Sequence, residues 1–419
     1  MPKIYFLDVT NRDGVQSSRV IMSKLQRTML NYYLGKLGIH QSEFGFPFAR
    51  VERNYLEANL ELQDMGAMGD LVLEGWCRAI VQDVDAALPT GVKHLNLSMS
   101  TSDQMIVNKF MGRLDREKVI EEMVEAVHRA REGGIEKIGV NAEDASRTDM
   151  SYLVRYVRAA KDAGADRFRY CDTLGYETPL NFYQRMRTIA EETGMDVEVH
   201  CHNDLGMCEA NSVAGAQGAL DGGVDCYINT VINGVGERAG QADLVSCILA
   251  MKYGAGLEKY EVADPIDLSV SYKLGTYIAN AFRMPVPIHQ VGIGANAFAH
   301  ESGIHADGAL KDRHNYELYD FEVLGRGEDE RIPTGRVITT GEFGGLAGFL
   351  HVYKEIGIEF SDRAHAAAIL ELVQIANTHN QMPLTADELR FIYQYPDQVA
   401  KLMALTPVGV KERLAAARS

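Results

Sequence analysis

The chain has 419 residues, of which 46% are hydrophobic and 24% charged, and this composition is typical of a folded globular protein. Its net charge of -16 disfavours non-specific binding to nucleic acids or membranes, since both are themselves anionic. No apolar run approaches the roughly 20 residues of a membrane span, and the 6 cysteines show no CxxC spacing. We therefore expect a cytoplasmic protein with free thiols that binds neither nucleic acid nor membrane.

Short apolar runs alternate with longer amphipathic runs from Lys3 to about Tyr253, which is typical of repeated βα units. The runs that predict strands are Ile4–Val9, Ser42–Phe46, Asp70–Gly75, His94–Met99, Lys137–Asn141, Arg167–Asp172, Asp196–Cys201 and Asp225–Val231. The runs that predict helices are Ser23–Leu37, Val51–Met65, Val81–Leu88, Arg116–Glu132, Ser151–Ala163, Leu180–Thr193, Gly206–Leu220 and Ala242–Tyr253.

Strands that are each followed by a helix favour a closed (β/α)₈ barrel, which usually takes about 250 residues. The alternative is a doubly wound open sheet with a glycine-rich nucleotide turn after its first strand, but here DVTNRDG stands in place of GxGxxG. We predict an α/β fold in which a TIM barrel is followed by a small linker subdomain and a helical C-terminal tail.

The barrel pattern stops after Gly254, and the rest of the chain changes character. We expect a helix over Asp267–Phe282, followed by an extended linker with two prolines over Met284–Gln290. Two glycine-rich segments come next, over Gly292–Glu317 and over Thr334–Glu359, and the second contains a helix at Leu346–Ile356. The tail is predicted to form helices over Arg363–Ala376 and Asp387–Leu405, the latter broken at Pro396. The predicted domains are therefore a catalytic barrel over 1–255, a linker and subdomain over 256–359, and a helical segment over 360–419.

The stretch EVHCHN places two histidines at the end of the seventh predicted strand. Because side chains alternate along a strand, His200 and His202 point to one face and Cys201 points away. Active sites of such barrels lie at the carboxyl ends of the strands, where polar residues of this chain accumulate. A lone HxH pair is as often an ordinary pair of core or surface residues, so its partners decide its meaning.

Two further residues could complete a metal site with these histidines. Asp13 follows the first strand and Asn233 follows the eighth, and these strands are neighbours in a closed barrel. Two imidazoles with a carboxylate suit a divalent ion such as Mg²⁺, Mn²⁺, Zn²⁺, Fe²⁺ or Co²⁺. The structural alternatives are a surface turn with a salt bridge around Asp13 and a glycine turn around Asn233.

Arg12 could stabilise an oxyanion beside this ion, because its guanidinium is permanently charged and donates paired hydrogen bonds. Such an arrangement suits chemistry on a 2-oxo acid, whose carboxylate and carbonyl oxygens chelate a metal. Thr173 and Glu143 could bind the substrate or orient the ligands, although Thr173 could equally cap a helix and Glu143 pair with Arg147. His305 lies outside the barrel, and histidine is the usual proton-transfer group near neutral pH.

The motifs DVTNRDGVQ, EVHCHNDLGMCEAN, INTVINGVGERAG and AFAHESGIHADGALKDRHNYE together resemble a known family. They are similar to the acyl-CoA-condensing branch of the DRE-TIM metallolyase superfamily, which includes isopropylmalate, homocitrate, citramalate and Re-type citrate synthases. The resemblance runs in the same order from Lys3 to Glu359. It implies a metal-dependent Claisen condensation of acetyl-CoA with a 2-oxo acid, followed by hydrolysis of the thioester.

The resemblance also implies roles for individual residues. By motif, the metal ligands are Asp13, His200, His202 and Asn233; Arg12 stabilises the developing alkoxide; Gln16 and Thr173 contact the 2-oxo acid; and Glu143 lines the pocket. His305, with Glu301 and Tyr316, matches an SGIHxDG element that in this family reaches the active site of the partner subunit and helps to deprotonate acetyl-CoA. We therefore expect a homodimer.

The acceptor is less sharply indicated. The segment EGWCRA resembles homocitrate or Re-type citrate synthases, and Arg78 in it could meet the distal carboxylate of a dicarboxylic 2-oxo acid. The third-strand histidine of lysine-pathway homocitrate synthases is absent, and Met105 stands where isopropylmalate synthases tend to have histidine. We favour 2-oxoglutarate or oxaloacetate, with isopropylmalate or citramalate synthase as the alternative.

Two other classes of function are open to such a barrel. A metal-dependent lyase or aldolase shares the barrel motifs, but the SGIHADG element argues against it. A non-catalytic descendant is disfavoured because the residues of the proposed site are intact.

Overall fold

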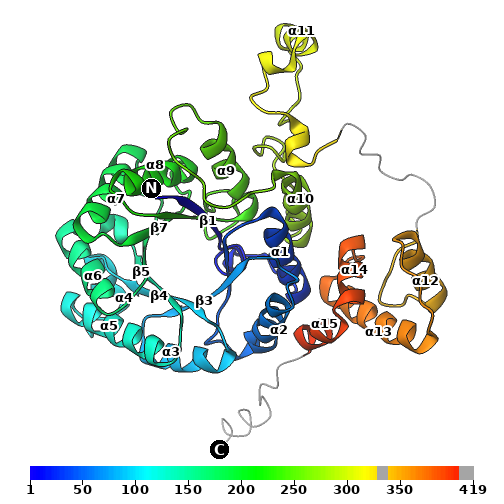
Figure 1. Cartoon of the computed structure of the whole chain (residues 1–419), viewed down its shortest axis with the longest axis horizontal. Helices are drawn as coiled ribbons and strands as arrows, with labels where there is room; N and C mark the ends of the chain where they lie inside the picture. Colours follow the sequence, from blue (N-terminus) through cyan, green and yellow to red (C-terminus); the bar gives the residue numbers. More distant parts are fainter. Residues whose placement is uncertain (328–337, 405–419) are drawn as a thin grey trace, which may run out of the picture.

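The computed structural model describes residues 1–327 and 338–404, and its centre is a closed barrel of parallel strands in the order β1 to β8 (Figure 1). The strand β1 pairs with β8 as well as with β2, which closes the barrel. The strands are β1 (Ile4–Asp8), β2 (Gln41–Gly45), β3 (Val72–Arg78), β4 (His94–Ser100), β5 (Lys137–Glu143), β6 (Arg167–Asp172), β7 (Asp196–Cys201) and β8 (Cys226–Thr230). The predicted TIM barrel is confirmed, and the open doubly wound sheet is excluded.

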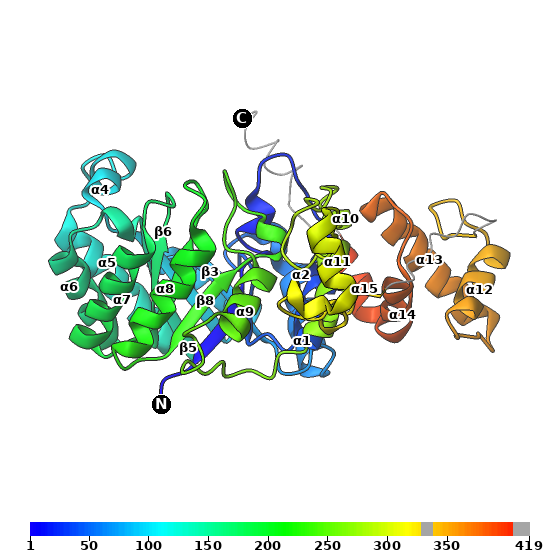
Figure 2. The ribbon, with the colours of Figure 1, turned by 90° about the horizontal axis from the view of Figure 1, so that it is seen from above.

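A ring of helices surrounds these strands. The helices are α1 (Lys24–Leu37), α2 (Arg53–Asp64), α3 (Val81–Ala87), α5 (Arg116–Glu132), α6 (Met150–Asp162), α7 (Pro179–Thr193), α8 (Cys208–Asp221) and α9 (Leu244–Tyr253). Several begin where the sequence offers a capping side chain; Ser23, for example, accepts a hydrogen bond from the backbone of Gln26 in a capping box. A short extra helix that was not predicted, α4 (Asp103–Lys109), stands out on the side opposite the N-terminus (Figure 2).

The strands have two different faces because side chains alternate along them. On β6, Phe168 and Tyr170 face outward into the apolar layer beneath the helices, and both are fully buried. The alternate residues Arg167 and Arg169 point into the barrel, where both pair with Glu198 of β7. The apolar core therefore lies between strands and helices, whereas the interior of the barrel carries charge.

Beyond the barrel the described chain is helical. The helices are α10 (Ser271–Ala281), α11 (Gly303–Lys311), α12 (Leu346–Glu355), α13 (Arg363–Asn380), α14 (Ala386–Gln394) and α15 (Pro396–Met403). Pro396 does not merely break a helix, because it opens α15, where its missing N–H costs nothing. The beginning of the segment predicted from Thr334 and the end of the helix predicted to Leu405 lie outside the described residues.

The last three helices lie beside α1 and α2 (Figure 1). The Tyr33 hydroxyl of α1 donates a hydrogen bond to Asp387 at 2.8 Å, and Lys401 of α15 lies 3.5 Å from Glu57 of α2. In contrast, α11 stands away from the barrel and has no buried residue (Figure 1). None of the helices within 1–327 and 338–404 combines the length and apolar character that crossing a bilayer requires.

The packing of α8 on α7 depends on a glycine and can be tested. A Cβ atom on Gly218 would lie 2.2 Å from the carbonyl oxygen of Tyr183, so the two helices would have to separate. We expect Gly218→Ala to lower the melting temperature, with a cost of about 1–3 kcal/mol typical of overpacking. Gly348→Ala on α12 is the control, since its nearest contact would be 3.8 Å away and alanine favours helix. Equal melting temperatures for both variants would contradict this description.

Candidate active site

A cavity of about 580 Å³ opens at the carboxyl ends of the strands, where the sequence predicted the site. The predicted residues that line it are Arg12, Asp13, Gln16, Arg78, Glu143, Thr173, His200 and His202. The predicted residues that do not line it are Asn233, Glu301, His305 and Tyr316. The barrel thus brings together all the predicted residues of its first seven βα units.

The loop after β1 is held in place by buried polar contacts. Asn11 donates hydrogen bonds to the carbonyl oxygen of Arg27 and to Asn31, both at 2.9 Å. In return, Arg27 donates to the carbonyl oxygen of Asn11 at 2.9 Å. The next two residues, Arg12 and Asp13, are consequently directed into the cavity from a fixed backbone.

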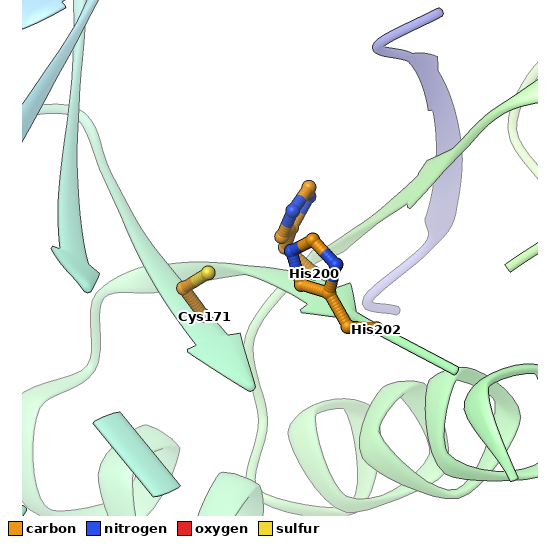
Figure 3. Close-up of side chains that lie close together, drawn as sticks. All are labelled: Cys171, His200 and His202. Carbon is orange, nitrogen blue, oxygen red and sulfur yellow. The ribbon is translucent and has the colours of Figure 1, made fainter. Parts of the chain in front are cut away.

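Asp13, His200 and His202 converge at the base of the cavity. The Oδ2 atom of Asp13 lies 3.2 Å from Nε2 of His200 and 4.0 Å from Nε2 of His202. Cys171 of β6 is paired in register with His200, and its thiol lies within 4.8 Å of ligand atoms of both imidazoles (Figure 3). All four side chains are buried.

The geometry of this group fits a divalent ion. Donor atoms that share one ion at about 2.1 Å lie roughly 3 to 3.5 Å apart, close to the spacing of Asp13 and the imidazoles. Nδ1 of His200 and Nδ1 of His202 are both buried without a hydrogen-bond partner among the described residues. The spacing of Asp13 Oδ2 and the two Nε2 atoms is therefore the one expected of side chains that bind one divalent cation.

The protonation states also suit metal binding, which requires neutral imidazoles and an ionised acid. Burial, with His200 beside it, lowers the pKa of His202 to about 3, and burial lowers that of His200 as well. Burial alone would raise the pKa of Asp13, but the Arg12 guanidinium and the imidazoles hold it well below its usual range. Burial raises the pKa of Cys171 to about 12, so this thiol stays protonated.

Arg12 is oriented from three sides. Its Nη1 donates to Asp13 at 2.7 Å and its Nε to Glu43 of β2 at 2.5 Å. Its Cζ lies 5.5 Å from the centre of the Trp76 ring. These contacts leave the Nη2 group available to a ligand in the cavity.

The other predicted residues of the cavity each make a hydrogen bond or an ion pair with a neighbouring residue. Glu143 pairs with Lys109 of α4 at 2.5 Å, and not with Arg147, which pairs with Asp144. Thr173 does not cap a helix, because its hydroxyl accepts a hydrogen bond from the backbone N–H of Asp144 at 2.8 Å. At the mouth of the cavity, Arg78 makes two hydrogen bonds of 2.7 and 2.8 Å to Asp83.

The structure places the remaining predicted residues elsewhere. The side-chain amide of Asn233 donates to the carbonyl oxygen of Gly275 in α10 at 2.8 Å, so this residue faces α10. Its role as a metal ligand stays a prediction. The segment 301–318, which contains α11 and is called the α11 segment below, carries His305 and Tyr316 with their ring centres 4.4 Å apart. Glu301 is exposed at its start.

Cys171 and Lys109 are among the cavity residues that the sequence analysis did not anticipate. Cys171 precedes Thr173 by two residues, so the alternation of β6 could have placed both on the inner face. Lys109 depends on the short helix α4, whose seven residues show no periodic signal in the sequence.

A closed parallel barrel with an acid and two imidazoles at its carboxyl end defines a TIM-barrel protein with a candidate metal centre. The chain belongs to the HMGL-like family, whose sequence model matches residues 3–277. A second family model, described as homocitrate synthase post-HMGL domain-like, matches residues 293–380.

Individual relatives cover almost the whole chain. It is 52% identical to a protein named citrate (Re)-synthase from Dehalococcoides mccartyi, over 97% of this chain and 99% of the relative. It is 35% identical to 2-isopropylmalate synthase 2 of Caldanaerobacter subterraneus subsp. tengcongensis, over 93% of this chain and 95% of the relative. A hydroxymethylglutaryl-CoA lyase structure from Pseudomonas aeruginosa has a TM-score of 0.55 at 16% identity, covering 68% of this chain and 95% of the lyase, which shows a shared fold.

If Asp13, His200 and His202 are the metal ligands, as predicted, substitutions of Asp13 and of Cys171 should have different effects on Mn²⁺ binding. We expect Asp13→Asn to weaken Mn²⁺ binding by more than about 100-fold, since it removes a charged ligand. We expect Cys171→Ala to leave the affinity within a few-fold, because a protonated thiol is a poor ligand for a hard cation. Calorimetric titration of metal-free protein measures both. A large loss with Cys171→Ala would assign the thiol to the metal site instead.

Proposed function

We propose that this chain condenses acetyl-CoA with a dicarboxylic 2-oxo acid, most consistently oxaloacetate, and hydrolyses the resulting thioester to release citrate and CoA. The observation that carries the proposal is the convergence of Asp13, His200 and His202 beside Arg12 in one buried cavity. The extensive identity to a protein named citrate (Re)-synthase supports oxaloacetate as acceptor.

Asp13, His200 and His202 would hold the divalent ion. When bound, such an ion acts as a Lewis acid that polarises the carbonyl group of the 2-oxo acid. Arg12 lines the same cavity, its Nη2 group is not used by Glu43 or Asp13, and it stabilises the negative charge that develops on the carbonyl oxygen as the new carbon–carbon bond forms. Thr173 and Gln16 line the cavity and contact the acceptor.

The distal carboxylate of the acceptor meets the cations on the β3 and β4 side of the cavity. Arg78 and Lys109 both line it there and keep donors that Asp83 and Glu143 do not use. Because both cations already have an anionic partner, an apolar acceptor remains the alternative, as in the relative named 2-isopropylmalate synthase 2.

The proton from acetyl-CoA goes to a group outside the barrel. His200 and His202 are the only histidines among the described residues that line the cavity, and both are assigned to the ion. We assign the proton transfer to His305 of a second copy of this chain, assisted by Glu301 and Tyr316, in a cytoplasmic homodimer.

Exposed apolar side chains support this dimer. On the α11 segment, the exposed fractions of Ile304, Leu310 and Leu318 are 77%, 89% and 71%. The segments that follow several barrel strands also expose apolar residues; these are Ile21, Val51, Val107, Met111, Tyr176, Leu180 and Leu205. Such surfaces are usually covered by a partner, and a twofold dimer would cover both at once.

A release assay for free thiol tests the activity itself. We expect purified protein with Mn²⁺ and acetyl-CoA to release CoA with oxaloacetate faster than with 2-oxoglutarate, 2-oxoisovalerate, pyruvate or glyoxylate. Arg12→Ala should reduce kcat by at least about 100-fold, because the proposed role of Arg12 is to stabilise transition-state charge. No release with any acceptor would refute the proposed reaction.

Subunit mixing tests the assignment of His305. We expect Arg12→Ala and His305→Ala homodimers to be inactive alone, but to recover about one quarter of wild-type activity when co-expressed, since half the dimers are mixed and each holds one complete site. Arg12→Ala co-expressed with Asp13→Asn is the control and should recover nothing, because each barrel of a mixed dimer would then carry one of the two changes. Absence of recovery in the first pair would place His305 within its own subunit's site or outside catalysis.

A further inference from the structure

Glu43 has an unusual position behind Arg12. One carboxylate oxygen, Oε2, accepts a hydrogen bond from Nε of Arg12 at 2.5 Å, and the other, Oε1, lies 2.7 Å from Nη1 of Arg169. Glu43 and Arg169 are both fully buried. The carboxylate therefore connects the arginine of the site to a second arginine deeper in the barrel.

We propose that Glu43 is a positioning residue that fixes the direction of the Arg12 guanidinium, and that Arg169 in turn fixes Glu43. The inference rests on the role proposed above for Arg12. Neither Glu43 nor Arg169 lines the cavity, so both act through Arg12 and not on the substrate.

The other carboxylates nearby cannot replace Glu43 in this role. Glu74 and Glu198 pair with Arg167 and Arg169 and make no ion pair with Arg12 within the described residues. Asp13 does contact Arg12, but it is adjacent in sequence and is assigned to the metal. Among the described residues, Glu43 is thus the carboxylate that reaches Arg12 from another strand and fixes its approach to the cavity.

A fixed direction matters because a guanidinium donates in one plane. If Arg12 were free to rotate about its side chain, its hydrogen bonds would have to be reoriented during the reaction, and that cost appears in kcat. Acetyl-CoA binding does not depend on this plane, so the KM for acetyl-CoA should change little.

A double-mutant cycle with Arg12 separates positioning from general structural damage. We expect Glu43→Gln to lower kcat on the order of 100-fold in the wild-type background. In the Arg12→Ala background the same change should have little further effect, because its target is gone. Glu43→Asp keeps the charge but shortens the side chain, so its kcat should lie between those of wild type and Glu43→Gln. This variant replaces Glu43→Gln in the cycle if Glu43→Gln folds poorly.

Glu74→Gln is the matched control from the same charged interior. Burial raises the pKa of Glu74, and glutamine has nearly the same shape as a glutamic acid side chain. We expect this variant to keep kcat within about threefold of wild type, since its partners do not include Arg12.

Trp76 gives a readout that does not depend on activity. It is the 1 tryptophan of the sequence, and Cζ of Arg12 lies 5.5 Å from its ring centre. We expect Glu43→Gln to move the tryptophan emission of metal-free protein toward that of Arg12→Ala, while Glu74→Gln leaves the emission unchanged. In the Arg12→Ala background, Glu43→Gln should produce no further shift.

The outcomes are distinct. Unchanged emission in Glu43→Gln, or additive losses of kcat in the cycle, would overturn the positioning role. If wild-type protein released no thiol with any acceptor, the proposed reaction would fail, and the emission cycle would still decide whether Glu43 positions Arg12.

Discussion

The site depends on the charged interior of the barrel. Arg169 is fully buried and donates hydrogen bonds to Glu43 of β2 and Glu198 of β7. Removing one member of such a group would leave a buried charge without its partner, which typically costs several kcal/mol. The ion pairs therefore restrict the relative positions of the strands more tightly than apolar packing in the barrel would, because charge requires a specific partner at a specific distance.

Because side chains alternate along each strand, the inward positions of neighbouring strands connect this charged interior to the site. On β7 the inward positions are Glu198 and then His200, with His202 directly after the strand, and on β6 they are Arg169 and then Cys171. Charged residues thus lie at the floor of the site and the candidate metal ligands above them. The ion pairs that stabilise the interior also supply preorganised charge next to the reacting groups, where the low dielectric constant strengthens each interaction.

The sequence predicted the fold well where local patterns decide it. The bounds of β6 and β7 agree with the prediction, and His200, His202 and Asp13 could be placed because alternation and barrel order fix their face. Lys109 could not be placed, because α4 has seven residues and shows no clear period. The orientation of Asn233 also escaped prediction, since its left-handed backbone, with φ of 58°, turns the side chain toward α10.

The contrast between the barrel and the α11 segment bears on the proposed proton transfer by a second subunit. The barrel cavity holds fixed charge, two buried imidazoles that stay neutral and an arginine with few free donors, so it is suited to binding and polarising an acceptor. A group that must accept and return a proton needs access to both states near neutral pH, and an imidazole with a pKa of about 3, such as that of His202, cannot supply this. In the proposed dimer, the exposed His305 would avoid that conflict, because it would enter the low-dielectric cavity only when a second subunit brought it there.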